Sequence, residues 1–179
     1  RRKVLCINPT HLKGVELMFQ IAEALPDIPF LFCESWNLSD RWRDYALARA
    51  AHLGNIEWVP ATRDMSLLYG DAKLLLMPSI WEETYGRSAS EAIISGIPVI
   101  ASKRGGLPEA VGDGGVILDA DGDIKDWILT VERAFNDKSY YQSLCEAALD
   151  YSHREEAQPD FIVSKFLESI ESHVQRSVL

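Results

Sequence analysis

The stretch KLLLMPSIWEETYGRSASEAIISGIPVIAS, residues 73–102, combines the features of a strand, a loop, a helix and a second strand. KLLLM at 73–77 is a short apolar run suited to a buried strand, and PVIA at 98–101 is another. Between them we expect a helix from about residue 87 to residue 95, ended by Gly96. The stretch therefore predicts two parallel strands joined by a crossover helix.

The same alternation continues on both sides of this unit. Further strands are expected at 3–7, 28–33, 56–59 and 115–118, and further helices at 13–25, 40–53, 65–72, 123–136, 138–151 and 160–176. We expect Asp40 and Asp64 to cap two of these helices. The pattern predicts a single α/β domain, a doubly wound parallel six-stranded sheet with helices on both faces, which is a Rossmann-like fold. Ligands of such sheets bind at the carboxyl ends of the strands.

The composition is that of a soluble globular protein, with 47% hydrophobic and 25% charged residues in a chain of 179. The formal net charge of −9 argues against a nucleic-acid partner. The longest run without charge, 92–102, has 11 residues and is too short to span a bilayer. No signal peptide is expected at the start of the chain. Because it opens at Arg1 without a methionine, we expect it to be a piece of a longer protein.

Neither the cysteines nor the histidines have the spacing of metal ligands. Cys6, Cys33 and Cys145 are far apart, so we expect reduced thiols and no metal site. LDADGD at 118–123 invites a metal-loop interpretation, but a calcium loop that began with its first aspartate would have Thr130 at the twelfth position, where an acid is required. We therefore interpret these aspartates as turn and cap residues of the next helix.

The loop at 78–86 leads into the helix that begins just past Gly86. A helix start offers unpaired N–H groups and a partial positive charge, which suit a phosphate, and Ser88 adds a hydroxyl donor. Glu91, in the first turn or so, could accept hydrogen bonds from the two hydroxyls of a ribose, while Glu83 would face what lies beyond the phosphate. The alternative that Glu91 only complements the helix dipole stays open.

A second candidate lies in NPTHLKG, 8–14, at the end of the first strand. Lys13 is expected to open the first helix, where its ammonium group could neutralise a diphosphate. A solvated lysine is the alternative. An ordinary dinucleotide-binding domain would require G-x-G-x-x-G after this strand, and INPTHLKG lacks it.

EETYGRSASEA at 82–92, followed by GIPVIA and GGLPE, resembles the signature of retaining glycosyltransferases of family 4, which have the two-domain GT-B fold. In that family two glutamates with seven residues between them flank an aromatic–glycine pair, and Glu83 and Glu91 match them. The KG pair at the first helix is similar to the family's diphosphate lysine. The resemblance covers nearly the whole chain, but only the carboxyl-terminal half of the fold. It implies that the acceptor-binding amino-terminal domain is absent from this chain.

The resemblance also implies a role for each matching residue. Glu91 would bind the ribose, Glu83 would place the donor sugar, and Lys13 would bind the diphosphate. Val59 and Pro60, with Met65, would lie beside the base. The sugar hydroxyls and phosphates would be held by the amides around Tyr85, Gly86, Arg87 and Ser88. One departure is Asn8, which stands where the family usually has an arginine paired with the lysine on the diphosphate. Replacement cations considered are Lys103, Arg104, Arg63 and Arg87.

The implied activity is hexosyl transfer, with retention, from a nucleotide-diphosphate sugar to an acceptor, in polysaccharide or glycolipid synthesis. No metal or cofactor is expected. The resemblance implies a location in the cytoplasm or at the inner face of the membrane, with membrane association only through parts absent here. The fragment alone would bind the donor with little or no turnover. Two other functions stay open: a non-catalytic nucleotide-sugar-binding module that works with a separate acceptor subunit, and a GT-B-type sugar-nucleotide epimerase.

Overall fold

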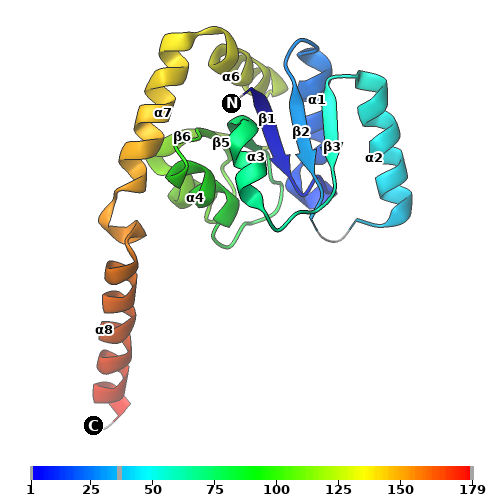
Figure 1. Cartoon of the computed structure of the whole chain (residues 1–179). Helices are drawn as coiled ribbons and strands as arrows, with labels where there is room; N and C mark the ends of the chain where they lie inside the picture. The colour runs from blue at the N-terminus through cyan, green and yellow to red at the C-terminus, as the bar shows by residue number, and fades with distance from the viewer. Residues whose placement is uncertain (1, 36–37, 178–179) are drawn as a thin grey trace.

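The computed structural model describes residues 2–35 and 38–177 (Figure 1). Its six strands form one sheet in the order β3-β2-β1-β4-β5-β6, and every neighbouring pair is parallel. The strands are β1 Lys3–Ile7, β2 Phe30–Cys33, β3 Ile56–Val59, β4 Ala72–Met77, β5 Val99–Ser102 and β6 Gly115–Leu118. The strand order reverses between β1 and β4. The predicted doubly wound sheet is therefore confirmed, and its switch point lies between these two strands.

Eight α-helices and three 3-10 turns connect and flank the strands in the described part of the chain. The helices are α1 Val15–Ala24, α2 Asp40–Leu53, α3 Met65–Asp71, α4 Arg87–Ile94, α5 Leu107–Val111, α6 Ile124–Asn136, α7 Lys138–Ser152 and α8 Pro159–Ser177. The 3-10 turns are η1 His11–Lys13, η2 Gly112–Gly114 and η3 Glu155–Ala157. All seven helices expected from the sequence are present within a few residues of their predicted ends.

Helices cover both faces of the sheet, as the alternation of side chains along β1 shows. Val4 and Cys6 belong to a core built with α1, α2 and α6, whereas Leu5 belongs to a second core built with α3, α4 and α5. A parallel sheet that is buried on both faces needs apolar residues at successive positions, because each face has its own core. This explains why the strands are short apolar runs rather than alternating patterns.

Three local predictions differ from the structure. Lys13 does not open α1 but ends η1, because Gly14, with a φ of +73°, separates the 3-10 turn from the helix. The N-cap of α2 is Ser39 rather than Asp40, since the Ser39 side chain accepts a hydrogen bond from the Trp42 N–H at 3.3 Å. The third difference is α5, which was not expected from the sequence because two glycines precede this segment and a proline lies in its first turn.

Helix α8 extends away from the sheet in Figure 1. It carries exposed apolar side chains at Ile162, Val163, Phe166, Leu167 and Ile170. In the described part of the chain, no helix combines the length and the apolar content needed to cross a membrane.

Candidate functional site

The loop between β4 and α4 is held from two sides at the carboxyl edge of the sheet. On one side the N–H groups of Ile80 and Trp81 donate hydrogen bonds to the Leu12 carbonyl, at 3.1 and 3.2 Å. On the other side the Gly106 N–H donates to the Glu83 carbonyl at 2.6 Å. The two segments that carry the sequence motifs are therefore fixed to one another by backbone contacts.

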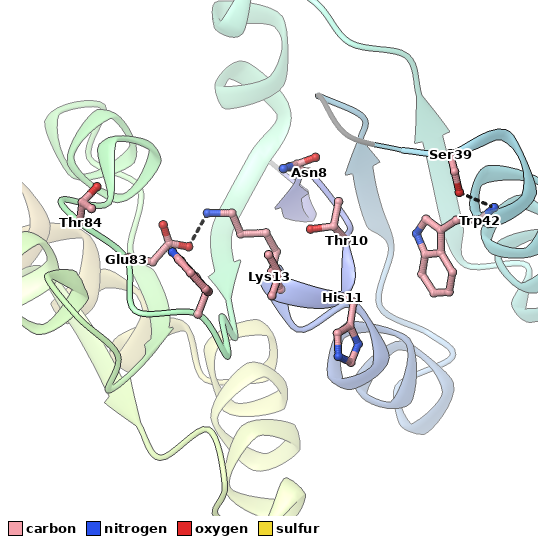
Figure 2. Close-up of a pocket in the computed structure, with 10 residues that line it drawn as sticks. Asn8, Thr10, His11, Lys13, Ser39, Trp42, Glu83 and Thr84 are labelled. Atoms are coloured by element: carbon pink, nitrogen blue, oxygen red, sulfur yellow. Dashed lines mark hydrogen bonds and ion pairs between the residues drawn. The ribbon is translucent and has the colours of Figure 1, made fainter.

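Lys13 and Glu83 point toward one another in Figure 2 and form an ion pair. The Ser79 hydroxyl donates a hydrogen bond to the same carboxylate oxygen of Glu83 at 2.7 Å. The two charged side chains are only 22% and 11% exposed, so solvent screens the pair incompletely. An anionic ligand that binds Lys13 has to compete with this carboxylate.

Helix α4 begins as predicted, directly after Gly86. Gly86 adopts a φ of +79°, which strongly favours glycine, and a Cβ atom there would lie 2.9 Å from Leu107 Cδ2, so this side chain would have to shift. The N–H groups of Arg87 and Ser88 make no hydrogen bond to any described residue. These two donors lie at the positive end of the helix and are available to an anion.

Glu91 is the fifth residue of α4 and lies in its second turn, so its expected place in the first turn is wrong. The helix dipole acts mainly within the first turn, which weakens the interpretation of Glu91 as a dipole partner only. The Tyr69 hydroxyl donates a hydrogen bond to the Glu91 carboxylate at 2.8 Å. Burial, together with this carboxylate, raises the pKa of Tyr69, which keeps the hydroxyl protonated as a donor.

A cavity of about 570 Å³, here called the α4 cavity, brings most of the predicted site residues together. It is lined by Ile7, Asn8, Lys13, Ser35, Met65, Met77, Glu83, Thr84, Tyr85, Gly86, Arg87, Ser88 and Glu91. The predicted residues Val59 and Pro60 do not line this cavity, whereas Met65, which was also expected near the base, does. Ile7, Ser35, Met77 and Thr84 were not singled out from the sequence.

Asn8 lies at the end of β1 and has a left-handed backbone, with a φ of +56°. It is 4% exposed, and its Oδ1 atom is buried without a hydrogen-bond partner among the described residues. Of the cations considered as replacements for the missing arginine, Arg87 lines the α4 cavity. Arg104 instead pairs with Asp121 and Glu82.

A second cavity of about 610 Å³ is here called the tryptophan cavity, and Figure 2 draws its lining. It is lined by Asn8, Thr10, His11, Leu12, Lys13, Ser39, Trp42, Trp81, Glu83 and Thr84. Four of these residues also line the α4 cavity: Asn8, Lys13, Glu83 and Thr84. The Lys13–Glu83 pair therefore lies in a wall between two open volumes.

Two of the three aspartates in residues 118–123, Asp119 and Asp123, accept hydrogen bonds from the backbone, while Asp121 pairs with Arg104. Asp123 caps α6 by accepting a hydrogen bond from the Lys125 N–H at 2.9 Å, and Asp119 accepts one from the Asp121 N–H at 3.0 Å. The interpretation as cap and turn residues is confirmed. Among the residues that the structure describes, no three histidine, cysteine or acidic side chains lie close enough to hold a metal ion. The expectation that the activity needs no metal stays a prediction.

Known proteins resemble the chain in sequence. The family model for glycosyl transferases group 1 matches residues 8–150. D-inositol 3-phosphate glycosyltransferase from Mycobacterium sp. (strain KMS) is 36% identical over 129 residues, which make up 68% of this chain and 29% of that protein. Spore coat protein SA of Bacillus subtilis is 29% identical over 117 residues, 59% of this chain and 31% of that protein. The chain thus spans about a third of the length of these curated relatives.

Solved structures share the fold. A glycosyltransferase from Rickettsia africae superposes with a TM-score of 0.82 at 17% identity, covering 96% of this chain and 48% of that one. Anabaena HepE in complex with UDP superposes with a TM-score of 0.80 at 18% identity, covering 96% of this chain and 49% of that one. The six-stranded Rossmann-like sheet therefore matches those of glycosyltransferases of known structure. With the family match extending over most of its length, the chain belongs to the glycosyl transferases group 1 family.

Proposed function

We propose that this chain is the carboxyl-terminal, donor-binding domain of a retaining glycosyltransferase and binds a nucleotide-diphosphate sugar in the α4 cavity. The observation that carries the proposal is that Lys13, both motif glutamates and the unpaired amides at the start of α4 line one cavity. Family membership supports the reaction class, and a neighbour in complex with UDP supports the class of donor. The exposed apolar residues of α8 and the length of the relatives support a further, acceptor-binding domain.

Each part of the donor has a chemical counterpart in the cavity. The diphosphate lies between the Lys13 ammonium and the N–H groups of Arg87 and Ser88, where cation and helix dipole act together. The ribose hydroxyls donate to the Glu91 carboxylate, and the base lies beside Met65. The sugar lies against Glu83 and the backbone near Tyr85.

The proposed reaction transfers the sugar with retention at its anomeric carbon. The acceptor oxygen forms a bond to this carbon on the face from which the diphosphate leaves. The carbon–oxygen bond to the diphosphate breaks with its electron pair on the diphosphate, which then takes the proton of the acceptor hydroxyl. Lys13 and the α4 amides stabilise the charge that develops on the leaving group, and Glu83 orients the sugar. No metal or cofactor enters this scheme.

For the whole protein we propose a hexosyltransferase of polysaccharide or glycolipid synthesis that acts in the cytoplasm or at the inner face of the membrane. The chain alone is expected to bind the donor and to turn over little of it, because the acceptor-binding domain lies outside it. Incubation of the whole protein with a donor, followed by product analysis, separates transfer from epimerisation of the sugar.

Calorimetric titration with UDP, GDP and ADP tests the donor assignment. The phosphate contacts are common to all three nucleotides, so the base decides which of them the chain prefers. We expect one of the three to bind at a single saturable site. The corresponding nucleoside without phosphates should bind far more weakly. If the chain is folded and binds none of the three nucleotides, the donor-binding proposal is wrong.

Glu91→Ala is expected to weaken binding of the preferred nucleoside diphosphate by about tenfold, because a hydrogen bond to a charged group contributes about 1.5 kcal/mol. Thermal unfolding should change little, since Glu91 is exposed and lies outside the first helical turn. Tyr69→Phe is the matched control, as it removes the hydroxyl that contacts Glu91 but keeps the carboxylate. Unchanged affinity together with a lower melting temperature would show that Glu91 is a structural residue.

A further inference from the structure

The tryptophan cavity and the α4 cavity share four lining residues, and both members of the Lys13–Glu83 pair are among them. Glu83 is the residue to which the proposed function assigns the transferred sugar. A molecule bound in the tryptophan cavity would therefore lie close to that sugar, because Glu83 lines both cavities. The second substrate of a group transfer has to lie close to the transferred group, and this cavity meets that requirement.

The lining of the tryptophan cavity differs in kind from that of the α4 cavity. Its apolar surface comes from Trp42, Trp81 and Leu12, and Trp81 is 54% exposed although it sits in a cavity wall. Hydroxyl and imidazole groups of Thr10, His11 and Ser39 line it as well. Apolar and aromatic walls with a few polar groups are typical of a small-molecule site. The ring of a sugar or cyclitol matches both features, with apolar C–H faces and a rim of hydroxyls.

One of the four residues shared by the two cavities has a buried polar atom without a hydrogen-bond partner among the described residues. Asn8 is 4% exposed, and its Oδ1 atom is buried without a hydrogen-bond partner among the described residues. An amide both donates and accepts, whereas the arginine of the family can only donate. The unpartnered atom is an acceptor and needs a donor, which a ligand hydroxyl supplies and a phosphate without a proton does not.

We propose that the tryptophan cavity is an acceptor subsite and that it takes a ring bearing several hydroxyl groups, a sugar or a cyclitol. This rests on the proposed function, because it is the donor sugar at Glu83 that makes the second cavity an acceptor site. The ring packs against Trp81 and Trp42, and one hydroxyl reaches the shared wall near Asn8 and Glu83. The chain therefore contributes to acceptor binding as well as to donor binding.

The indole N–H groups of the tryptophans provide the test. In the nitrogen-15-labelled chain, the resonances of Trp42, Trp58, Trp81 and Trp127 are assigned by single Trp→Phe variants. The chain is then titrated with glucose, with myo-inositol and with D-inositol 3-phosphate, each with and without saturating UDP. We expect at least one of the three to shift Trp42 and Trp81 saturably. Trp127, which is 1% exposed and does not line the tryptophan cavity, should not move.

Two variants separate the cavity from the general surface. Trp81→Ala should weaken the response of the Trp42 resonance at least tenfold, because it removes one aromatic wall. Leu129→Ala, which removes an exposed apolar side chain from α6, should leave it unchanged. Circular dichroism melting checks that both variants fold.

The outcomes separate this inference from the donor assignment. If UDP binds but no ring compound shifts Trp42 and Trp81, or if Trp81→Ala responds like the unaltered chain, the acceptor subsite is wrong and the donor site stands. If UDP alone shifts the Trp42 and Trp81 resonances to the positions that they reach with a ring compound, the cavity belongs to the donor. The acceptor subsite is then wrong as well. If a ring compound binds to a chain that binds no nucleotide, the donor assignment fails and the acceptor assignment fails with it.

Discussion

Replacing Lys13 with methionine is expected to lower the affinity for UDP by about thirtyfold, which corresponds to about 2 kcal/mol. Methionine keeps an unbranched apolar stem but removes the only lysine among the described residues that line the α4 cavity. Two effects add: the diphosphate loses a charge-assisted hydrogen bond, and the Glu83 carboxylate, freed from its partner, repels the phosphate. Calorimetry at low and high salt measures the change, and the loss should be larger at low salt because screening is weaker.

Glu83→Gln is the matched control for Lys13→Met. It removes the carboxylate that competes for the ammonium, so UDP should bind equally well or more tightly, while the Ser79 hydroxyl still has an acceptor. Affinity for uridine, which has no phosphates, should be the same in both variants. If Lys13→Met binds UDP like the unaltered chain and differs only in melting temperature, the ion pair is a structural contact and the diphosphate lies elsewhere.

The fold was accessible from the sequence because each element carries its own signal. Six short apolar runs alternate with amphipathic segments, and the connection rules for parallel strands leave few ways to arrange them. Capping chemistry predicted the start of α3 correctly at Asp64, whose side chain accepts from the Ser66 N–H at 3.1 Å. It failed at α2, where Ser39 and Asp40 are adjacent and both are good caps. Sequence alone cannot choose between such neighbours.

The candidate site was predictable where its residues share one motif. Glu83, Gly86 and Glu91 are close in the sequence, and a loop that leads into a helix places them together almost regardless of the rest of the fold. The partners they find are different. Ser79 and Lys13 meet at Glu83, and Tyr69 reaches Glu91 from α3. Those contacts depend on how α3 and η1 pack against the loop, and this packing cannot be predicted from a local sequence pattern.

The expected position of the base shows the same limit. Val59 ends β3 and Pro60 follows it, and the strand order places β3 at the edge of the sheet, two strands from β1. Met65, a few residues later, lies at the start of α3 and lines the α4 cavity. The tryptophan cavity is the extreme case, because its two aromatic walls come from α2 and from the loop after β4. Trp42 and Trp81 are 39 positions apart, and only the folded chain brings them together.

Gly14→Ala is expected to lower the free energy of unfolding by about 3 kcal/mol, or roughly 9 °C in melting temperature. Gly14 has a φ of +73°, and a Cβ atom there would lie 1.9 Å from the Pro78 carbonyl oxygen. A left-handed backbone costs a residue with a Cβ about 1 kcal/mol, and the rest comes from forcing two backbone segments apart. Those segments carry Lys13 and the loop to Glu83, so UDP affinity should fall as well.

Gly54→Ala separates the two contributions. Gly54 has a φ of +76°, almost the same as Gly14, but a Cβ atom there would meet nothing within 4 Å. This variant should lose only the backbone contribution of about 1 kcal/mol and bind UDP like the unaltered chain. If Gly14→Ala is no less stable than Gly54→Ala, η1 and the β4–α4 loop are not in close backbone contact. The approach of Lys13 to Glu83, on which both the donor site and the shared wall depend, would then have to be abandoned.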